Sequence, residues 1–203
     1  MEKRIARLLT ILFHPLLVPF YMLIILLNIN ILFAILIPVK VKLALSGLVF
    51  LTTILFPLLV IFLLYRMKLI KSFYLESKEE RIYPLLTMAV SYYITYYILK
   101  SFPISFIFSY YMLGSTFLAI LALIISFYRK ISLHMIGIGG ILGLLLGLSL
   151  NLGLDLTWLL VISIILSGVL GFARIQSNSH KPSDIYSGFL VGAGIMFLLF
   201  IFL

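Results

Sequence analysis

Three ionisable side chains stand close together in the last third of the chain, in the order Arg174, His180 and Asp184. Their spacing, R-x5-H-x3-D, includes Pro182, which suits the first turn of a helix. If that helical turn extends back to His180, the carboxylate four residues later accepts a proton from one imidazole nitrogen, and the other nitrogen can act as a nucleophile or base. The pattern therefore predicts a site that handles phosphate, with a solvated turn and a helix cap as the alternative.

Two further polar clusters carry residue types that a phosphoryl transfer needs. Ser132 and His134 stand at the start of an apolar run, where a hydroxyl, an imidazole and a helix N-terminus can hold phosphate oxygens and His134 can protonate a leaving alkoxide. Lys78 and Arg81 can neutralise the oxygens of a phosphoryl group in its transition state. The alternative for the charge run around Lys78 and Arg81 is an ordinary solvated loop.

The elements that must position these residues are apolar. The chain has 203 residues, 64% of them hydrophobic and 10% charged, with a mean hydropathy of +1.29. A bilayer core needs about 20 apolar residues per helix, so we expect an all-α, polytopic transmembrane helical bundle of six to seven spans, seven being preferred, in a single domain over residues 1–203. The predicted spans are 8–37, 43–65, 83–99, 104–128, 131–150, 156–172 and 182–203.

The first of these apolar runs is longer than one span needs and contains Pro15 and Pro19. Proline interrupts helices, so this run is expected to include a kinked or interfacial piece. We also expect it to stay with the chain rather than be cleaved as a signal peptide, because no small-residue cleavage site precedes its continuation.

With seven spans, most basic residues fall on one membrane face. Of the 15 lysines and arginines, only Lys40, Lys42 and Lys100 lie on the other face. The positive-inside rule then places the basic face and the N-terminus in the cytoplasm of a bacterial-type membrane. Two spans separate each polar cluster from the next, so all three clusters are expected on this same face, as an active site built from separate loops requires.

The composition also limits the partners and cofactors. A net charge of +9 in a chain of this hydropathy points to lipid head groups and the bilayer rather than to nucleic acid. The absence of cysteine excludes thiolate sites, and three histidines in three separate segments make a poor metal site, so neither a metal nor a cofactor is predicted. His14, the third histidine, is expected to be an interfacial residue rather than a ligand. The sequence does not indicate an oligomeric state.

Glycines recur at four-residue spacing in two of the predicted spans, as Gly139, Gly143 and Gly147 in one and Gly188 and Gly192 in the other. Stripes of small residues let membrane helices approach closely. These two helices carry the two candidate histidines, so the glycines are expected to bring the candidate site together.

The order of a basic motif, then Ser-x-His at a helix start, then Arg-x5-His-x3-Asp resembles the phosphatidic acid phosphatase type 2 superfamily, which also includes vanadium-dependent haloperoxidases. The three motifs of that family are K-x6-R-P, P-S-G-H and S-R-x5-H-x3-D. Here Ala173 stands for the serine of the third motif, and Ile131 and Leu133 stand for the proline and glycine of the second. Arg81 stands for the arginine of the first, with the lysine at a different spacing. The resemblance covers residues 78–203, which form a family-like catalytic core.

This resemblance implies a metal-independent phosphatase built on a helical bundle. In it, His180 would attack phosphorus, Asp184 would orient His180, and His134 would act as the general acid. The residues that would hold the phosphate are Arg174, Arg81, Ser132 and Lys78.

The sequence thus predicts a membrane-embedded lipid phosphatase that removes a phosphate, or the terminal phosphate of a diphosphate, through a phosphohistidine at His180. Its substrate would be a phospholipid or a polyprenyl phosphate. Two alternatives stay open: a catalytically inactive relative that binds anionic lipid or scaffolds partners, and a transporter of phosphorylated lipid.

Overall fold

The computed structural model describes residues 2–29, 32–69, 78–104, 106–177 and 179–203, with the backbone alone for 2–3, 32–33 and 78–81. All regular structure over these residues is helical. Six helices are long and apolar enough to cross a membrane, which confirms the predicted polytopic helical bundle of an integral membrane protein. They are Val39–Arg66, Ile82–Lys100, Phe106–Tyr128, Leu133–Leu152, Thr157–Gln176 and Pro182–Ile201.

The first apolar run is divided into two helices, α1 (Glu2–Leu12) and α2 (Val18–Asn28). The break falls at His14 and Pro15. A proline offers no N–H and disfavours a helical conformation for the residue before it. The His14 carbonyl instead accepts turn hydrogen bonds from the N–H groups of Leu17 and Val18. With 11 residues, α2 is too short to span a bilayer core of about 30 Å by itself.

Packing divides the chain into two compact units. The terminal unit consists of residues 1–18 and 130–203, and the central unit consists of residues 19–129. The terminal unit contains α1, α8 (Leu133–Leu152), α9 (Thr157–Gln176) and α10 (Pro182–Ile201). The central unit contains most of α2 and then α3 (Leu32–Ile35), α4 (Val39–Phe50), the π-helical segment η1 (Leu51–Leu55), α5 (Phe56–Arg66), α6 (Lys78–Lys100) and α7 (Phe106–Tyr128).

In the central unit, hydroxyl groups join η1 to α6. A π-helical turn displaces the regular backbone hydrogen bonds, and in a membrane the displaced groups need partners inside the protein. The Ser91 hydroxyl donates to the Thr52 carbonyl, and the Oγ1 atoms of Thr95 and Thr52 lie 2.8 Å apart. The irregular turn is therefore stabilised by side chains of the neighbouring helix.

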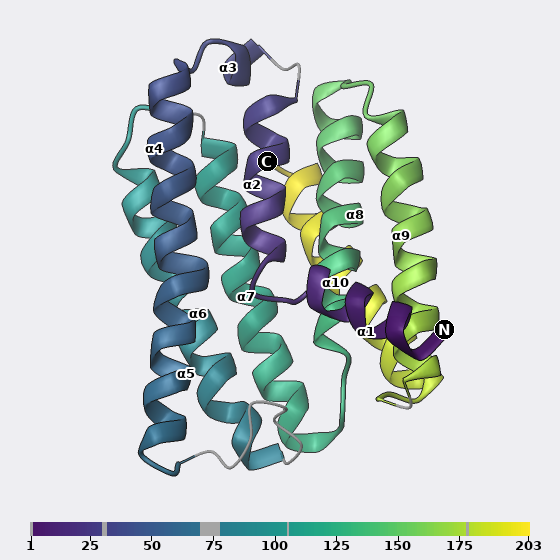
Figure 1. The fold of residues 1–203 in the computed structure, drawn as a ribbon. Coiled ribbons are helices and arrows are strands. Elements are labelled where there is room, and N and C mark those ends of the chain that lie inside the picture. Colours follow the sequence, from purple (N-terminus) through teal and green to yellow (C-terminus); the bar gives the residue numbers. More distant parts are fainter. Residues whose placement is uncertain (1, 30–31, 70–77, 105, 178) are drawn as a thin grey trace. The chain divides into compact units, whose positions relative to one another are not determined.

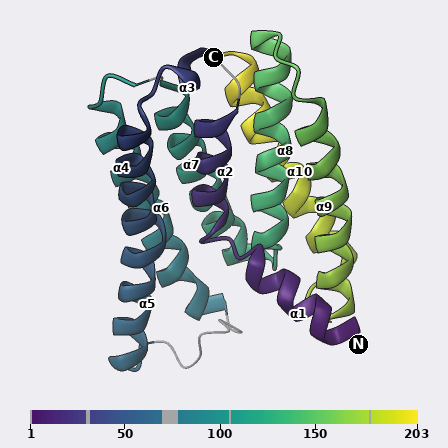
Figure 2. The same cartoon turned by 45° about the horizontal axis from the view of Figure 1, so that its top comes forward.

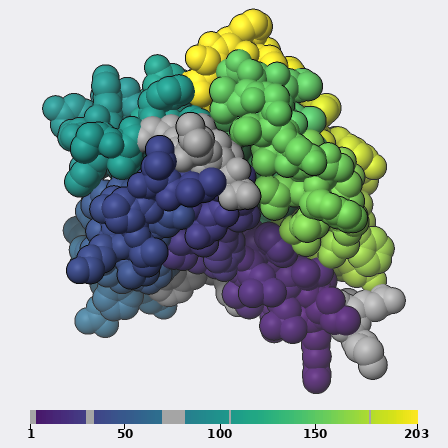
Figure 3. All heavy atoms as spheres, turned by 90° about the horizontal axis from the view of Figure 1, so that it is seen from above, coloured from purple at the N-terminus to yellow at the C-terminus, as the bar shows by residue number. Residues whose placement is uncertain are grey.

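In the terminal unit, α8 and α10 lie side by side with their backbones in contact (Figures 1 and 2). A Cβ atom added at Gly143 would overlap the carbonyl of Ala193, and one added at Gly192 would overlap the carbonyl of Ile136. In the space-filling view of Figure 3, the yellow atoms of α10 lie directly against the green atoms of α8. The predicted glycine stripes are thus confirmed as the contact surface. The other glycines of this surface are Gly139, Gly147 and Gly188.

Helix α1 lies across the lower parts of α8 and α9 in Figures 1 and 2. It is strongly amphipathic. Ala6 is buried, and Phe13, just past the helix, packs against the apolar core between α8, α9 and α10. That core consists of Met135, Ile138, Leu170 and Ile185. The exposed residues of α1 include large apolar ones, such as Leu8 and Ile11, beside Arg4 and Arg7, as expected of a helix at a membrane interface.

Replacing a glycine of the α8–α10 contact is expected to destabilise the protein. Gly143→Ala would push α10 away from α8, and overpacking against a backbone that cannot move aside costs about 2 kcal/mol or more of unfolding free energy. Gly168→Ala on α9 is the matched control, because no atom lies within 4 Å of the added methyl group. Thermal unfolding in detergent should show a clear loss for Gly143→Ala and none for Gly168→Ala; equal melting temperatures would contradict the close contact.

Candidate functional site

Five of the predicted site residues come together at one end of the terminal unit. Gly153, in the left-handed conformation with φ of 63°, ends α8 and lets α9 run back. Residues 177–181 then connect α9 to α10. The start of α8, the end of α9 and the start of α10 therefore meet at the same end, which carries Ser132 and His134, Arg174, and the His180–Asp184 pair respectively.

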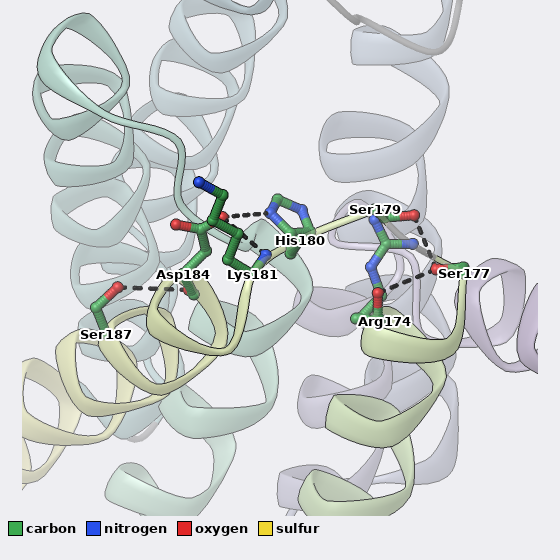
Figure 4. Close-up of polar contacts among 7 residues, drawn as sticks. All are labelled: Arg174, Ser177, Ser179, His180, Lys181, Asp184 and Ser187. Carbon is green, nitrogen blue, oxygen red and sulfur yellow. Dashed lines mark hydrogen bonds and ion pairs between the residues drawn. The ribbon is translucent and has the colours of Figure 1, made fainter.

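His180 and Asp184 form the predicted pair. His180 Nδ1 lies 3.6 Å from Asp184 Oδ2, and the two side chains are 8% and 13% exposed. His180 precedes the helix, since Lys181 is the N-cap residue and Pro182 begins α10. Asp184 Oδ2 also accepts a hydrogen bond of 3.2 Å from the Lys181 N–H (Figure 4). The same carboxylate oxygen thus caps the helix and lies at ion-pair distance from the imidazole, so Asp184 fits both the helix-cap and the site interpretation of the motif.

Ser132 is the N-cap residue of α8, but its side chain does not cap the helix. The residue is fully buried, and its hydroxyl has no hydrogen-bond partner among the described residues. Its backbone N–H donates to the Asp184 carbonyl at 3.2 Å, which ties the start of α8 to the start of α10. A Cβ at Gly188 would lie 2.7 Å from the Ser132 carbonyl, so glycine is needed for this contact. The backbone of Ser132 therefore contacts Asp184, the residue that pairs with His180.

His134 is buried in the first turn of α8 and contacts α1. Its Nε2 lies 3.1 Å from the backbone carbonyl of Thr10. A carbonyl only accepts hydrogen bonds, so the proton of the neutral imidazole is on Nε2 and Nδ1 has the lone pair. His14, Arg174 and His180 all lie within electrostatic range of His134.

Arg174 lies in the last turn of α9 and reaches the same threonine. Its Nη1 donates to Thr10 Oγ1 at 3.3 Å, whereas its buried Nε has no partner among the described residues. The Arg174 carbonyl accepts from the Ser177 hydroxyl at 3.2 Å and from the Ser179 N–H at 3.3 Å, which shapes the connection to α10 (Figure 4). The guanidinium is thus held on one side and has an unsatisfied donor on another.

His14 joins the site from the break between α1 and α2. Its ring packs edge to face against that of His134, with centroids 5.8 Å apart and an interplanar angle of 82°. Its Nδ1 accepts a hydrogen bond from the Leu16 N–H at 3.3 Å, so the proton of the neutral ring is on Nε2. Partial burial of the ring and, second, the charge of Arg174 lower the pKa of His14, although the residue as a whole is exposed.

Thr10 and His14 are the site residues that the sequence analysis missed. His14 was expected to be interfacial, and Thr10 was not considered, because both belong to an apolar run far from the motifs in sequence. The available signal was a hydroxyl and an imidazole at four-residue spacing beside Pro15.

Lys78 and Arg81 lie in the first turn of α6, in the central unit, and their side chains are outside the described residues. Their part in the site stays a prediction.

The arrangement suits an anion rather than a cation. Within the described part of the chain, no group of three or more His, Asp or Glu side chains could hold a metal ion. The donors that gather at this end are a hydroxyl, a guanidinium and imidazole nitrogens, near the amino ends of α8 and α10, whose N–H groups favour negative charge. This set can hold tetrahedral oxyanions.

Comparison with known proteins finds no relative: no protein-family model matches the sequence, and no curated protein or solved structure is significantly similar to it. The resemblance to the phosphatidic acid phosphatase type 2 superfamily therefore rests on the motif residues alone and stays a prediction.

The lowered pKa of His14 predicts a pH dependence of stability. A histidine whose folded pKa is lowered binds fewer protons in the folded state than in the unfolded state, so stability is lost as pH falls through the ordinary value of about 6.5. His14→Gln removes this contribution. Between about pH 7.5 and about pH 5.5, the melting temperature of the variant should fall less than that of the wild type. An equal fall in both proteins would contradict the burial of the neutral ring.

Proposed function

We propose that this protein is a membrane-embedded phosphatase that hydrolyses a lipid phosphate through a phosphohistidine at His180. The observation that carries the proposal is a pair of buried donors, the Ser132 hydroxyl and Arg174 Nε, that have no hydrogen-bond partner among the described residues and lie beside two histidines and a carboxylate. A buried polar atom without a partner costs about 1 to 3 kcal/mol, and such atoms are rare in native proteins. Phosphate oxygens are partners that satisfy a hydroxyl and a guanidinium together.

The reaction follows from the orientation of each group. Asp184 faces Nδ1 of His180, so Nε2 is the nitrogen that attacks phosphorus. A P–N bond forms, the bond between phosphorus and the lipid oxygen breaks, and the leaving alkoxide takes a proton from His134. Water then attacks phosphorus and gives a proton to His134, now neutral, while the P–N bond breaks; inorganic phosphate leaves and His180 is restored. Arg174 and Ser132 stabilise the charge on the oxygens of the phosphoryl group in both steps.

The substrate is a phosphorylated lipid, such as a phospholipid or a polyprenyl phosphate. The site residues lie at the ends of three membrane-spanning helices, which is the level of the lipid head groups. A lipid can therefore present its phosphate here while its chains stay in the bilayer. Lys78 and Arg81 are proposed as further phosphate ligands.

The proposed site faces the cytoplasm. In the terminal unit, the site end carries exposed basic residues from α1 and from both connections, whereas the exposed acidic residue Asp155 lies just before α9 at the other end. Basic residues are enriched on the cytoplasmic side of membrane proteins. The exposed basic residues of the site end are Arg4, Arg7, Lys130 and Lys181.

Removing either histidine is expected to abolish most phosphate release. In purified full-length protein, His180→Ala removes the nucleophile, and His134→Ala removes an acid whose contribution is about 10²- to 10⁴-fold. Inorganic phosphate released from a panel of lipid phosphates and diphosphates is measured in detergent and in vesicles. Unchanged turnover in both variants would refute the mechanism. Lipid binding without release would favour the inactive relative, and lipid flux without hydrolysis would favour the transporter.

Asp184→Asn should separate the catalytic role of this residue from its capping role. The amide oxygen of asparagine can still accept the hydrogen bond from the Lys181 N–H, so folding should persist, but a neutral amide no longer stabilises a positively charged His180. Phosphate release should fall by about 10-fold or more. Asp155→Asn is the matched control, because Asp155 Oδ1 accepts from the Thr157 N–H at 3.2 Å at the start of α9, at the other end of the unit. Similar losses in both variants would show that only capping matters.

A further inference from the structure

Thr10 is the residue that connects α1 to the candidate site. Its backbone carbonyl contacts His134 Nε2, and its hydroxyl accepts from Arg174 Nη1. His134 and Arg174 belong to different helices, and both reach the same residue of a third. A single residue of α1 therefore contacts the proposed general acid and a proposed phosphate ligand at once.

The hydrogen bond to the Thr10 carbonyl determines which nitrogen of His134 is available to exchange a proton with the substrate. Because Nε2–H is bound to the carbonyl, only Nδ1 can face a leaving oxygen. Neutral His134 has no proton at Nδ1, so it donates to a leaving group as the imidazolium and accepts a proton as the neutral ring. The carbonyl stabilises the imidazolium, because a hydrogen bond to a charged donor is stronger than one to a neutral donor.

The hydrogen bond to the Thr10 hydroxyl fixes the orientation of the Arg174 guanidinium. The hydroxyl donates its own proton to the Ala6 carbonyl at 2.8 Å, so its lone pairs are available to Arg174. With Nη1 held there, Nε remains as the buried donor without a partner among the described residues. A guanidinium held in one orientation loses less freedom when it binds a phosphate.

We propose that Thr10 is a positioning residue of the phosphate site: its hydroxyl sets the orientation of Arg174 and its carbonyl sets the tautomer of His134. The inference rests on the proposed function for the role of His134. Helix α1 is thereby a component of the site, although its sequence carries none of the motifs. Its polar contacts add to the burial of Ala6 as the reason that α1 stays against α9.

The hydroxyl is tested by phosphate binding, which does not depend on turnover. Binding of radiolabelled inorganic phosphate to the purified full-length protein in detergent is measured by equilibrium dialysis. Thr10→Val removes a hydrogen bond to a charged group and should weaken binding about tenfold, whereas Thr10→Ser should restore it. Thr116→Val on α7 is the matched control, since the Thr116 hydroxyl makes the same kind of bond to the carbonyl four residues earlier.

The carbonyl is tested by nitrogen NMR of the full-length protein labelled with ¹⁵N-histidine, with His134 assigned from the signal that His134→Gln removes. The neutral ring should have its proton on Nε2.

The outcomes separate this inference from the proposed function. Wild-type binding retained or exceeded in Thr10→Val, no phosphate binding by the wild type, or a proton on Nδ1 of neutral His134 would each overturn the role of Thr10. Weakened binding in Thr10→Val, rescue by serine and a proton on Nε2 would support it. That same pattern without phosphate release from any lipid would refute the hydrolysis and leave the positioning role in place.

Discussion

The close approach of α8 and α10 is the constraint on which the candidate site depends. In a membrane, lipid is as apolar as the side chains, so helices associate through packing and hydrogen bonds rather than through the hydrophobic effect. Glycine faces a backbone carbonyl at several levels of this contact, up to Gly188 beside Ser132. The Ser132 N–H reaches the Asp184 carbonyl only because the helices touch there. The distance between the two proposed catalytic histidines is therefore set by residues that have no side chain.

Helix α1 provides hydrogen-bond partners for polar side chains of the site, whose burial without partners would cost free energy. His134 is buried and Arg174 is partly buried, so their polar atoms need partners, and α8, α9 and α10 turn mostly apolar residues toward each other. Helix α1 brings a carbonyl and a hydroxyl, and the break at Pro15 brings the ring of His14. These contacts satisfy Nε2 of His134 and Nη1 of Arg174. Among the described residues they leave the Ser132 hydroxyl and Arg174 Nε without a partner, and in the proposed function the phosphate oxygens are that partner.

The fold was largely predictable because it depends on local signals. The length of each apolar run gives the six spans from Val39 onward, whereas the first run, predicted as one span, is divided near Pro15 into α1 and the short α2. The four-residue spacing of Gly139, Gly143 and Gly147 gives the face along which α8 meets its partner. The convergence of Ser132, Arg174 and His180 at one end follows from the alternation of antiparallel spans. The role of Thr10 was not predictable, because nothing in the pattern of an amphipathic helix shows which helix end it crosses. The tautomer of His134 depends on that crossing, so it too requires the three-dimensional structure.

Asp184 shows why a motif and a helix cap are hard to tell apart by sequence. Helix starts favour a carboxylate in the first turn, and a histidine one residue before the cap falls within its reach whether or not the protein is an enzyme. The single oxygen Oδ2 serves both the Lys181 N–H and His180, so the pair does not identify a site by itself. Helix capping, however, does not explain a fully buried serine hydroxyl and a guanidinium nitrogen that lack hydrogen-bond partners within the described part of the chain. Ser132 and Arg174 therefore support the proposed phosphate chemistry more strongly than the histidine and the aspartate do.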